Sequence, residues 1–274
     1  MFGSFAKSST EGVGVMRSFG SYLLPAIVAG LYLFLYTPIF VLILFSFNDN
    51  AFTCAWTSFT THWYYDLFAS TEVWHALKNS LIVAFSSVLL SLTIGSGLIF
   101  FGARDTVKRL QILFYGSLAM PEIVLAVGLL SFFSFFAVPL GAMTLIVGHT
   151  LLGLGYVVPI LYGRFSELDE SLIEASYDLG ATQRQTFFSI VLPLLMPALI
   201  SAGLLVFIIS LDDFIISFFC AGASVQTLPL YIFAVIRTGA SPMINALSTI
   251  MLIFSSFFVL LFSFLHLKKM RSPE

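Results

Sequence analysis

The sequence has few charged residues for its length. Of its 274 residues, 9% are Asp, Glu, Lys or Arg, whereas 59% are hydrophobic. A typical soluble domain has about 25% charged residues, because charge covers most of a surface that faces water. The 12 basic and 14 acidic residues of this chain cannot cover a water-soluble surface of this size. The composition, with 31 Phe residues, therefore predicts a membrane protein.

Several kinds of site are missing from the sequence. Its two cysteines, Cys54 and Cys220, are too few for a disulfide scaffold or a four-cysteine metal site, and we expect them to stay unpaired rather than form a disulfide. The histidines form no HExxH pattern. The net charge of −2 gives no basis for a nucleic-acid partner. No GxxxxGK[ST] loop is present, and we expect this chain to bind no metal or cofactor; if ATP drives the protein, ATP-Mg must bind to another subunit.

Long apolar segments recur along the chain. A bilayer core of roughly 30 Å requires about 20 helical residues, and the backbone must be hydrogen-bonded within each segment. We therefore expect residues 1–21 to form an N-terminal segment, residues 22–267 a transmembrane domain and residues 268–274 a C-terminal tail. The sequence predicts an all-α membrane protein with six transmembrane helices, at about Tyr22–Ser46, Leu77–Phe101, Ile112–Ala137, Ala142–Tyr162, Leu194–Cys220 and Met243–Leu267.

Basic residues are distributed unequally between the two sides that six spans would create. The side that holds both termini would carry ten Lys and Arg residues, and the other side would carry Lys78 and Arg237. Because Lys and Arg collect on the cytoplasmic side of membrane proteins, the sequence predicts that both termini are cytoplasmic.

The segment 163–193, between predicted spans 4 and 5, is polar and acidic. An apolar stripe at spacings of four, three and four residues predicts a short amphipathic helix, formed by Leu168, Leu172, Ala175 and Leu179. Gly180 is expected to end this helix as its C′ residue. A second segment, Thr182–Val191, then leads to Pro193. Lipid headgroups favour Lys and Arg on such a helix, so its acidic face indicates docking to another protein.

This segment resembles the EAA loop of ABC importer permeases of the MetI-like superfamily. Six positions over 20 residues match the motif, namely Glu174, Ala175, Gly180, Ile190, Leu192 and Pro193. The usual second alanine of the motif is Ser176 in this chain. The resemblance implies that this loop couples the chain to an ATPase subunit, through Glu174, Ala175, Gly180, Leu172 and Leu179.

The resemblance extends over nearly the whole chain and is greatest to the PotC-type permeases of spermidine/putrescine importers. It is carried by Ser46-Phe47-Asn48, Asn79-Ser80, Met120-Pro121-Glu122-Ile123-Val124, Ser210-Leu211-Asp212-Asp213 and Ser241-Pro242-x-x-Asn245-Ala246. It implies the permease subunit of an ATP-driven importer, which is not itself an enzyme, moving polyamines across a bacterial inner membrane into the cytoplasm. The implied partners are an ATPase dimer, a second, PotB-like permease, a periplasmic substrate-binding protein and membrane lipid.

Three carboxylates fall within predicted spans. Each costs roughly 2.5–3.5 kcal/mol at the centre of a membrane helix, and such residues usually face a transport pathway. Glu122 is about 15 Å deep by helical rise, whereas Asp212 and Asp213 are adjacent and diverge by about 100°. A polyamine would pair its ammonium groups with these carboxylates and with an aromatic face such as Trp56. The alternatives are a hydrogen bond between helices for Glu122, a capping role for either Asp, and an interfacial position for Trp56.

Other functions are weaker matches to the sequence. A self-contained secondary transporter or channel leaves the acidic cytoplasmic loop unexplained, and an intramembrane enzyme lacks a recognisable Ser–His or metal cluster. A sister ABC importer for another small solute is the nearest rival, although anionic solutes would require Lys or Arg in the spans. His149 lies in the fourth predicted span with no evident partner, and we expect it to form an interhelical hydrogen bond rather than a proton relay.

Overall fold

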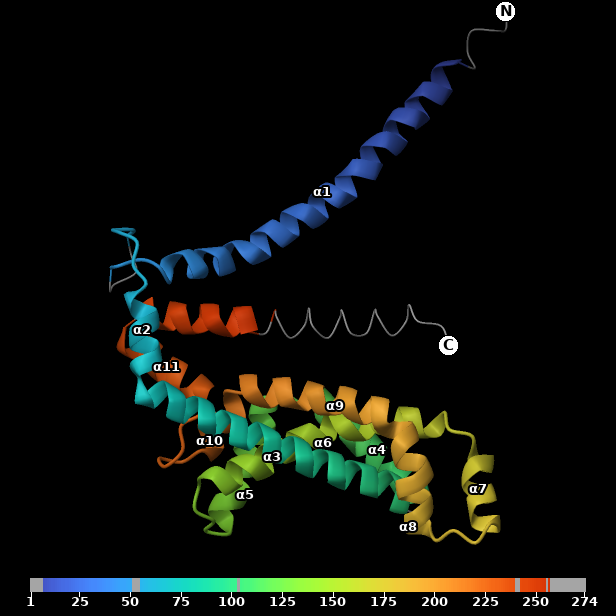
Figure 1. Ribbon diagram of the computed structural model, residues 1–274. Coiled ribbons are helices and arrows are strands. Elements are labelled where there is room, and N and C mark those ends of the chain that lie inside the picture. Colours follow the sequence, from blue (N-terminus) through green and yellow to red (C-terminus); the bar gives the residue numbers. More distant parts are fainter. Residues whose placement is uncertain (1–6, 51–54, 103, 240–241, 255, 257–274) are drawn as a thin grey trace, which may run out of the picture. The chain divides into compact units, whose positions relative to one another are not determined.

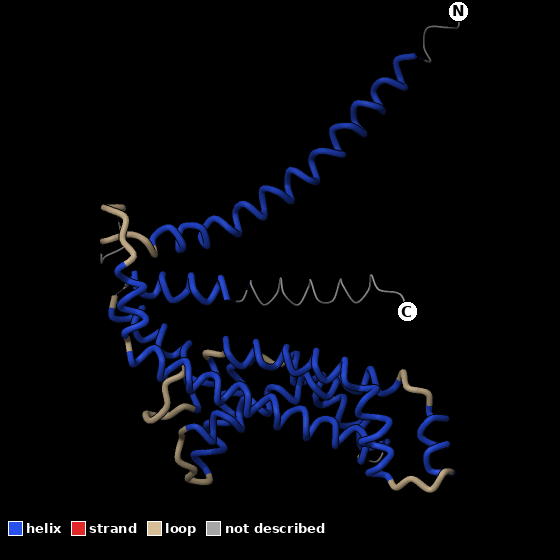
Figure 2. The backbone as a smooth tube through the Cα atoms, in the orientation of Figure 1, coloured by secondary structure: helices blue, strands red, loops and turns tan. Residues whose placement is uncertain are grey.

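A computed structural model of the chain describes residues 7–50, 55–102, 104–239, 242–254 and 256. Figure 2 shows that these residues are almost entirely helical. An isolated antiparallel bridge joins Asn48 to Phe59. The prediction of an all-helical chain is therefore confirmed for the described residues.

The helices follow one another with short connections (Figure 1). In chain order they are α1 (Lys7–Phe45), α2 (His62–Ala69), α3 (Thr71–Phe101), α4 (Arg104–Ala119), α5 (Glu122–Phe135), α6 (Ala142–Ser166), α7 (Glu170–Asp178), α8 (Gln183–Thr186), the π-helix η1 (Phe187–Val191), α9 (Leu192–Asp212), α10 (Ile215–Cys220) and α11 (Leu228–Thr238). The chain divides into two compact units, one of Ser70–Ala234 and one of Met1–Ala69 with Val235–Glu274.

Four stretches of the described chain are long and apolar enough to cross a membrane. They are Leu24–Phe45, Thr71–Phe101, Ala142–Ser166 and Gln183–Asp212, and they correspond to the first, second, fourth and fifth predicted spans. The helix Pro242–Phe254 is shorter, and the rest of the sixth predicted span lies outside the described residues. Six spans therefore remain a prediction.

The third predicted span, Ile112–Ala137, is not one continuous helix. α4 ends at Ala119 and α5 begins at Glu122, so the 14-residue α5 stands alone. Pro121 lies between them with φ −56° and ψ 130°. Its ring removes a backbone N–H and collides with the carbonyl four residues earlier, and it also disfavours the helical conformation at Met120. The structure therefore divides the third predicted span into two helices at Pro121.

The fifth predicted span, Leu194–Cys220, is also interrupted. α9 ends at Asp212, and Asp213 is extended, with φ −66° and ψ 119°. The Asp213 carboxylate then accepts hydrogen bonds from the backbone N–H groups of Ile216 (3.2 Å) and Ser217 (2.9 Å). These groups belong to the first turn of α10 and have no partner within the helix. The break thus exchanges helical backbone bonds for a side-chain cap.

The core of the Ser70–Ala234 unit lies where α3, α6 and α9 pack along one another (Figure 1). Small residues allow α3 and α6 to approach closely. A Cβ atom on Gly153 would lie 2.5 Å from the Ser91 hydroxyl oxygen, and one on Gly95 would lie 2.6 Å from Val157. The Ser91 hydroxyl donates to the backbone carbonyl of Thr150 at 3.0 Å. This packing fixes the buried face of α6.

In the other unit, Asn48 organises the segment between α1 and α2. Its amide nitrogen donates to the Ala55 carbonyl at 2.8 Å, and its amide oxygen accepts from the Thr57 backbone N–H at 3.0 Å. Its own backbone carbonyl accepts from the Trp63 indole N–H at 2.8 Å. Asn48 is fully buried, so these bonds satisfy a polar group that would otherwise be costly.

Candidate functional site

Both helix breaks carry a carboxyl group, and the two breaks lie close together. Glu122 is the first residue of α5, and Asp213 lies between α9 and α10. α5 packs against α10, and Ala126 and Ile216 lie in one buried cluster. Glu122 lies one helical turn before Ala126, and Asp213 lies three residues before Ile216, so this packing brings the two carboxyl groups to the same region. The structure thus brings together two acidic residues that lie about 90 positions apart in the sequence.

Asp213 is the buried member of this pair. Its side chain has 0% exposure, and its Oδ2 atom lies 3.3 Å from Nε2 of His149. Together with the Ile216 and Ser217 backbone groups, His149 surrounds the carboxylate with donors. Asp213 therefore acts as a cap and an anchor in this structure, with no surface open to a solute.

His149 has partners that the sequence does not reveal. The ring comes from the middle of α6, is 1% exposed, and places Nδ1 2.6 Å from the Ser210 hydroxyl of α9. That hydroxyl in turn lies 3.4 Å from the hydroxyl of Ser87 on α3. The expected interhelical hydrogen bond is confirmed. The signal that could have found it is the spacing of Ser210 and Asp213, which places two polar groups one helical turn apart in an apolar span.

Asp212 and Glu122 are the accessible carboxylates near the breaks. Asp212 is exposed at the end of α9, and Glu122 is partly exposed at the start of α5. The two adjacent aspartates therefore diverge, with Asp213 directed inward and Asp212 outward. Of the three membrane carboxylates, only these two could meet a solute directly in the part of the chain that the structure describes.

Trp56 belongs to the unit that contains Asn48. Its side chain is 50% exposed, and its ring meets that of Phe45 edge-on with centroids 6.4 Å apart. Such a placement suits an aromatic residue at a membrane surface as well as one at a pathway mouth. Cys54 lies outside the described residues, and Cys220 is a free, buried thiol.

The segment predicted to dock to another protein forms a helix–turn–helix. Asp169 caps α7 by accepting the Ser171 backbone N–H at 3.0 Å, and this bond holds the pKa of the Asp169 carboxyl below its ordinary value. At the other end Gly180 has φ +84°; its N–H donates to the Tyr177 carbonyl (2.8 Å), and the Ala181 N–H donates to that of Ser176 (3.0 Å). This pair of bonds is a Schellman motif, so the prediction that Gly180 ends the helix is confirmed.

The second half of this segment is fixed to the first. Ser176, at the position of the motif's second alanine, is buried and lies 2.8 Å from the Thr186 hydroxyl of α8. η1 follows with the wider turn of a π-helix, in which the Leu192 N–H donates to the Phe187 carbonyl. Pro193 explains the wider turn, because it lacks an N–H and crowds the carbonyl four residues before it.

The outer face of α7 is open. The side chains of Glu174 and Ala175 are exposed, Leu172 is 47% exposed, and Leu179 is 89% exposed. Leu172 on α7 and Leu179, which follows its last residue, are thus two large apolar side chains that the described Ser70–Ala234 unit leaves exposed. The face therefore presents both apolar surface and negative charge.

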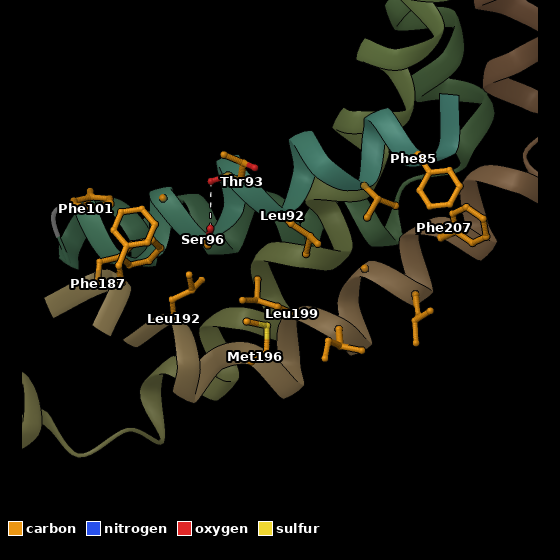
Figure 3. Close-up of a pocket in the computed structure, with 16 residues that line it drawn as sticks. Phe85, Leu92, Thr93, Ser96, Phe101, Phe187, Leu192, Met196, Leu199 and Phe207 are labelled. Carbon is orange, nitrogen blue, oxygen red and sulfur yellow. Dashed lines mark hydrogen bonds between the residues drawn. The ribbon is translucent and has the colours of Figure 1, made fainter. Parts of the chain in front are cut away.

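An apolar groove of about 830 Å³ runs between α3 and the η1–α9 helix (Figure 3). Phe85 and Phe207 meet at one end, with ring centroids 4.9 Å apart, and Phe101 meets Phe187 at the other end, 5.3 Å apart. None of the described residues that line the groove is charged. Its surface suits lipid tails or another helix and does not suit a charged solute.

Comparison with known proteins identifies the family. Residues 99–267 match the family described as binding-protein-dependent transport system inner membrane component. The chain belongs to this family. It is 35% identical over 243 residues to the spermidine/putrescine transport system permease protein PotC of Haemophilus influenzae, covering 88% of this chain and 95% of that protein. It is 34% identical over 229 residues to the putrescine transport system permease protein PotI of Escherichia coli K12, covering 80% and 82%.

Solved structures agree on the fold. A chain of a bacterial ABC transporter involved in the import of the acidic polysaccharide alginate superposes with a TM-score of 0.64 at 16% identity, covering 93% of this chain and 97% of that one. A chain of the inward-facing MetNI methionine ABC transporter gives 0.54 at 19% identity, covering 74% and 94%. This membrane component therefore has the fold of ABC importer permeases, and the resemblance stated from its sequence is confirmed.

Proposed function

We propose that this chain is the permease subunit of an ATP-driven importer that moves polyamines, such as spermidine or putrescine, from the periplasm to the cytoplasm. The observation that carries the proposal is the similarity to two polyamine permeases over most of the chain, combined with carboxyl groups at both helix breaks. A polyamine is a flexible aliphatic chain with two or more ammonium groups, so acidic residues within the membrane suit it.

The charge within the described spans has the sign that a cation requires. Asp213 is buried, whereas no Lys or Arg appears among the buried side chains of the described residues. Glu122 and Asp212 are the groups that we assign to direct contact with ammonium, with Asp213 behind Glu122. Trp56 is a candidate for cation–π contact near the mouth of the pathway. An inward-negative membrane potential favours entry of the same cations.

The helix–turn–helix from Asp169 to Val191 is assigned to ATPase coupling. α7 would enter a groove of an ATPase subunit through Leu172, Leu179 and the exposed Glu174 and Ala175, as amphipathic helices commonly do. Gly180 sets the angle at which α8 leaves α7, and the Ser176–Thr186 hydrogen bond holds that angle. Movement of the ATPase groove would therefore reach α9 through η1 as a rigid displacement.

The partners and location follow from the family. The chain would function with an ATPase dimer that binds ATP-Mg, a second, PotB-like permease and a periplasmic binding protein that captures the solute. It would span the bacterial inner membrane several times, with both termini in the cytoplasm, as the excess of Lys and Arg on that side predicts.

A sister importer for another small solute is the alternative that shares most of this support. The relative in the alginate system shows that the same fold serves an acidic polysaccharide. The carboxyl groups at the two helix breaks, Glu122 and Asp213, favour a cationic solute for the present chain. A self-contained secondary transporter would not need the exposed face of α7.

The experiment is uptake by the reconstituted complex. Proteoliposomes that contain both permeases and the ATPase are given labelled spermidine, labelled putrescine or an anionic solute, each with the binding protein outside and ATP inside. The proposal expects ATP-dependent uptake of a polyamine and none of the anion. Uptake of a polyamine by this chain alone without ATP would support the secondary-transporter alternative, and uptake of neither polyamine would refute the assigned solute.

A further inference from the structure

The buried histidine of α6 connects the two helix breaks. His149 contacts Asp213 directly, with Nε2 3.3 Å from Oδ2. Asp213 precedes α10, which packs against α5, the helix that begins with Glu122, the partly exposed residue assigned above to the transported cation. The groups come from separate elements, α6, the α9–α10 break and the start of α5, that lie close together in one compact unit (Figure 1). The sequence alone shows no evident partner for His149.

Polar groups contact both nitrogens of the ring. Nε2 lies 3.3 Å from Asp213 Oδ2 and 3.4 Å from the Ser217 hydroxyl, and with Asp213 ionised Nε2 donates to the carboxylate, because an ionised oxygen can only accept. In the tautomer that carries its hydrogen on Nε2, Nδ1 accepts from the Ser210 hydroxyl at 2.6 Å. The Ser210 bond therefore sets the orientation of the ring, and the ring holds Asp213.

We propose that His149 is a positioning residue for transport, which acts through Asp213 to hold both helix breaks and thereby to place Glu122 toward the passing ammonium group. This proposal rests on the proposed function, because it assumes that Glu122 meets the solute. His149 itself is 1% exposed and does not touch the solute. Its contribution is to keep the Asp213 carboxylate from turning away from α5.

The position of the break makes this role necessary. Asp213 is outside both α9 and α10, so no regular helix fixes its backbone, and its side-chain contacts hold the break. The Ile216 and Ser217 N–H groups hold the carboxylate from the α10 side, and the His149 donor holds it from the α6 side. Without the ring, the carboxylate keeps its cap but loses its anchor to α6, so the α9–α10 break beside the start of α5 is held less firmly.

Two amide substitutions distinguish the contribution of Nε2 from that of Nδ1. In His149→Gln the amide nitrogen reaches the place of Nε2 and can still donate to Asp213. In His149→Asn the shorter side chain reaches only the place of Nδ1, beside Ser210. We expect His149→Gln to keep uptake within about threefold of wild type. We expect His149→Asn and the apolar His149→Leu to lose about tenfold, as for a lost hydrogen bond to a charged group.

The measurements use the complete transporter with its binding protein. Maximal uptake rate should fall in His149→Asn and His149→Leu while the half-saturating concentration stays constant, because capture occurs on a separate protein. The matched control is His62→Leu, since His62 is an exposed histidine paired with Asp66 at 3.1 Å in the other compact unit. It should transport as wild type does.

A double-mutant cycle tests whether His149 acts through Asp213. If it does, His149→Leu combined with Asp213→Asn should transport within about twofold of the worse single variant, whereas independent effects would multiply the two single losses. Losses that multiply would overturn the proposal, because they would show that His149 acts independently of Asp213. A His149→Gln variant as impaired as His149→Leu would also overturn it, because a restored hydrogen-bond donor would then have no effect.

The same double-mutant cycle can be measured as the thermal stability of the purified complex, which does not require the solute. Non-additive losses of stability in His149→Leu and Asp213→Asn would support the contact, and additive losses would overturn it. If the wild-type complex imports no polyamine, the proposed function fails in the uptake assay, and the unfolding cycle still decides whether His149 anchors Asp213. The two failures are therefore distinguishable.

Discussion

Gly180 offers the sharpest test of the coupling assignment, because its requirement for glycine is purely conformational. Its φ of +84° lies in the left-handed region, and a Cβ atom added there would meet nothing within 4 Å. An L-residue in this region costs roughly 1–2 kcal/mol, a factor of about 5–30 in the population of the turn. That factor is the upper limit of the expected loss for Gly180→Ala, because docking to the ATPase would offset part of the strain.

Three substitutions at Gly180 should form a graded series. Gly180→Asn should be mildest, because Asn tolerates the left-handed conformation. Gly180→Pro should be the most severe, because proline fixes φ near −65° and removes the N–H that donates to the Tyr177 carbonyl. Polyamine uptake per ATP hydrolysed is the measurement, with the amount of permease in the membrane as the control. Normal coupling in Gly180→Pro, or equal losses in Ala and Pro variants, would refute the reasoning.

Three further substitutions follow from the same structure. Glu174→Lys reverses an exposed charge on α7 and should weaken co-purification with the ATPase; full association would remove Glu174 from the docking face. Asp212→Asn keeps shape and loses charge, so it should slow uptake but not assembly, and unchanged kinetics would take Asp212 out of the pathway. Gly153→Leu should lower the melting temperature, by an overpacking cost of about 1–3 kcal/mol, because its Cβ would collide with Ser91; a normal melting temperature would contradict the close packing.

Local chemistry made part of the structure predictable. The end of α7 could be predicted because the left-handed turn at Gly180 depends on a single residue type. Most long apolar runs could be recognised as helices, because the length and the hydropathy of a segment depend only on the residues of that segment. The family could likewise be recognised from the spacing of the Glu174–Pro193 motif, because the matching residues lie close together in the chain.

The breaks show what the apolar runs concealed. Pro121 and Asp213 both interrupt segments of continuously high hydropathy. A hydropathy average does not register that Pro121 has no backbone N–H to donate, or that the Asp213 carboxylate accepts the first N–H groups of the next helix. The break between α4 and α5 could have been predicted from the chemistry of Pro121 alone. The break at Asp213 is clear only once the Ile216 and Ser217 N–H groups are seen to bond its carboxylate.

The partners of His149 depend on tertiary structure. Its bonds to Ser210 and Asp213 span 61 and 64 residues, and they form because α6 packs beside α9 and α10. A single sequence does not specify which faces of these helices meet. For the same reason it left open which of Asp212 and Asp213 is accessible, whereas the structure exposes Asp212 and buries its neighbour.

The most direct test of the central claim, that acidic groups at the helix breaks carry a polyvalent cation, is Glu122→Gln in the complete transporter. The amide keeps the shape of the side chain and its ability to form hydrogen bonds, so folding and assembly should remain normal. The measurement is uptake of labelled spermidine beside ATP hydrolysis stimulated by the loaded binding protein. We predict that uptake falls by at least tenfold, as for a lost charge-assisted hydrogen bond, while stimulated hydrolysis changes much less. Equal losses of both, or normal uptake, would contradict a cation contact at Glu122.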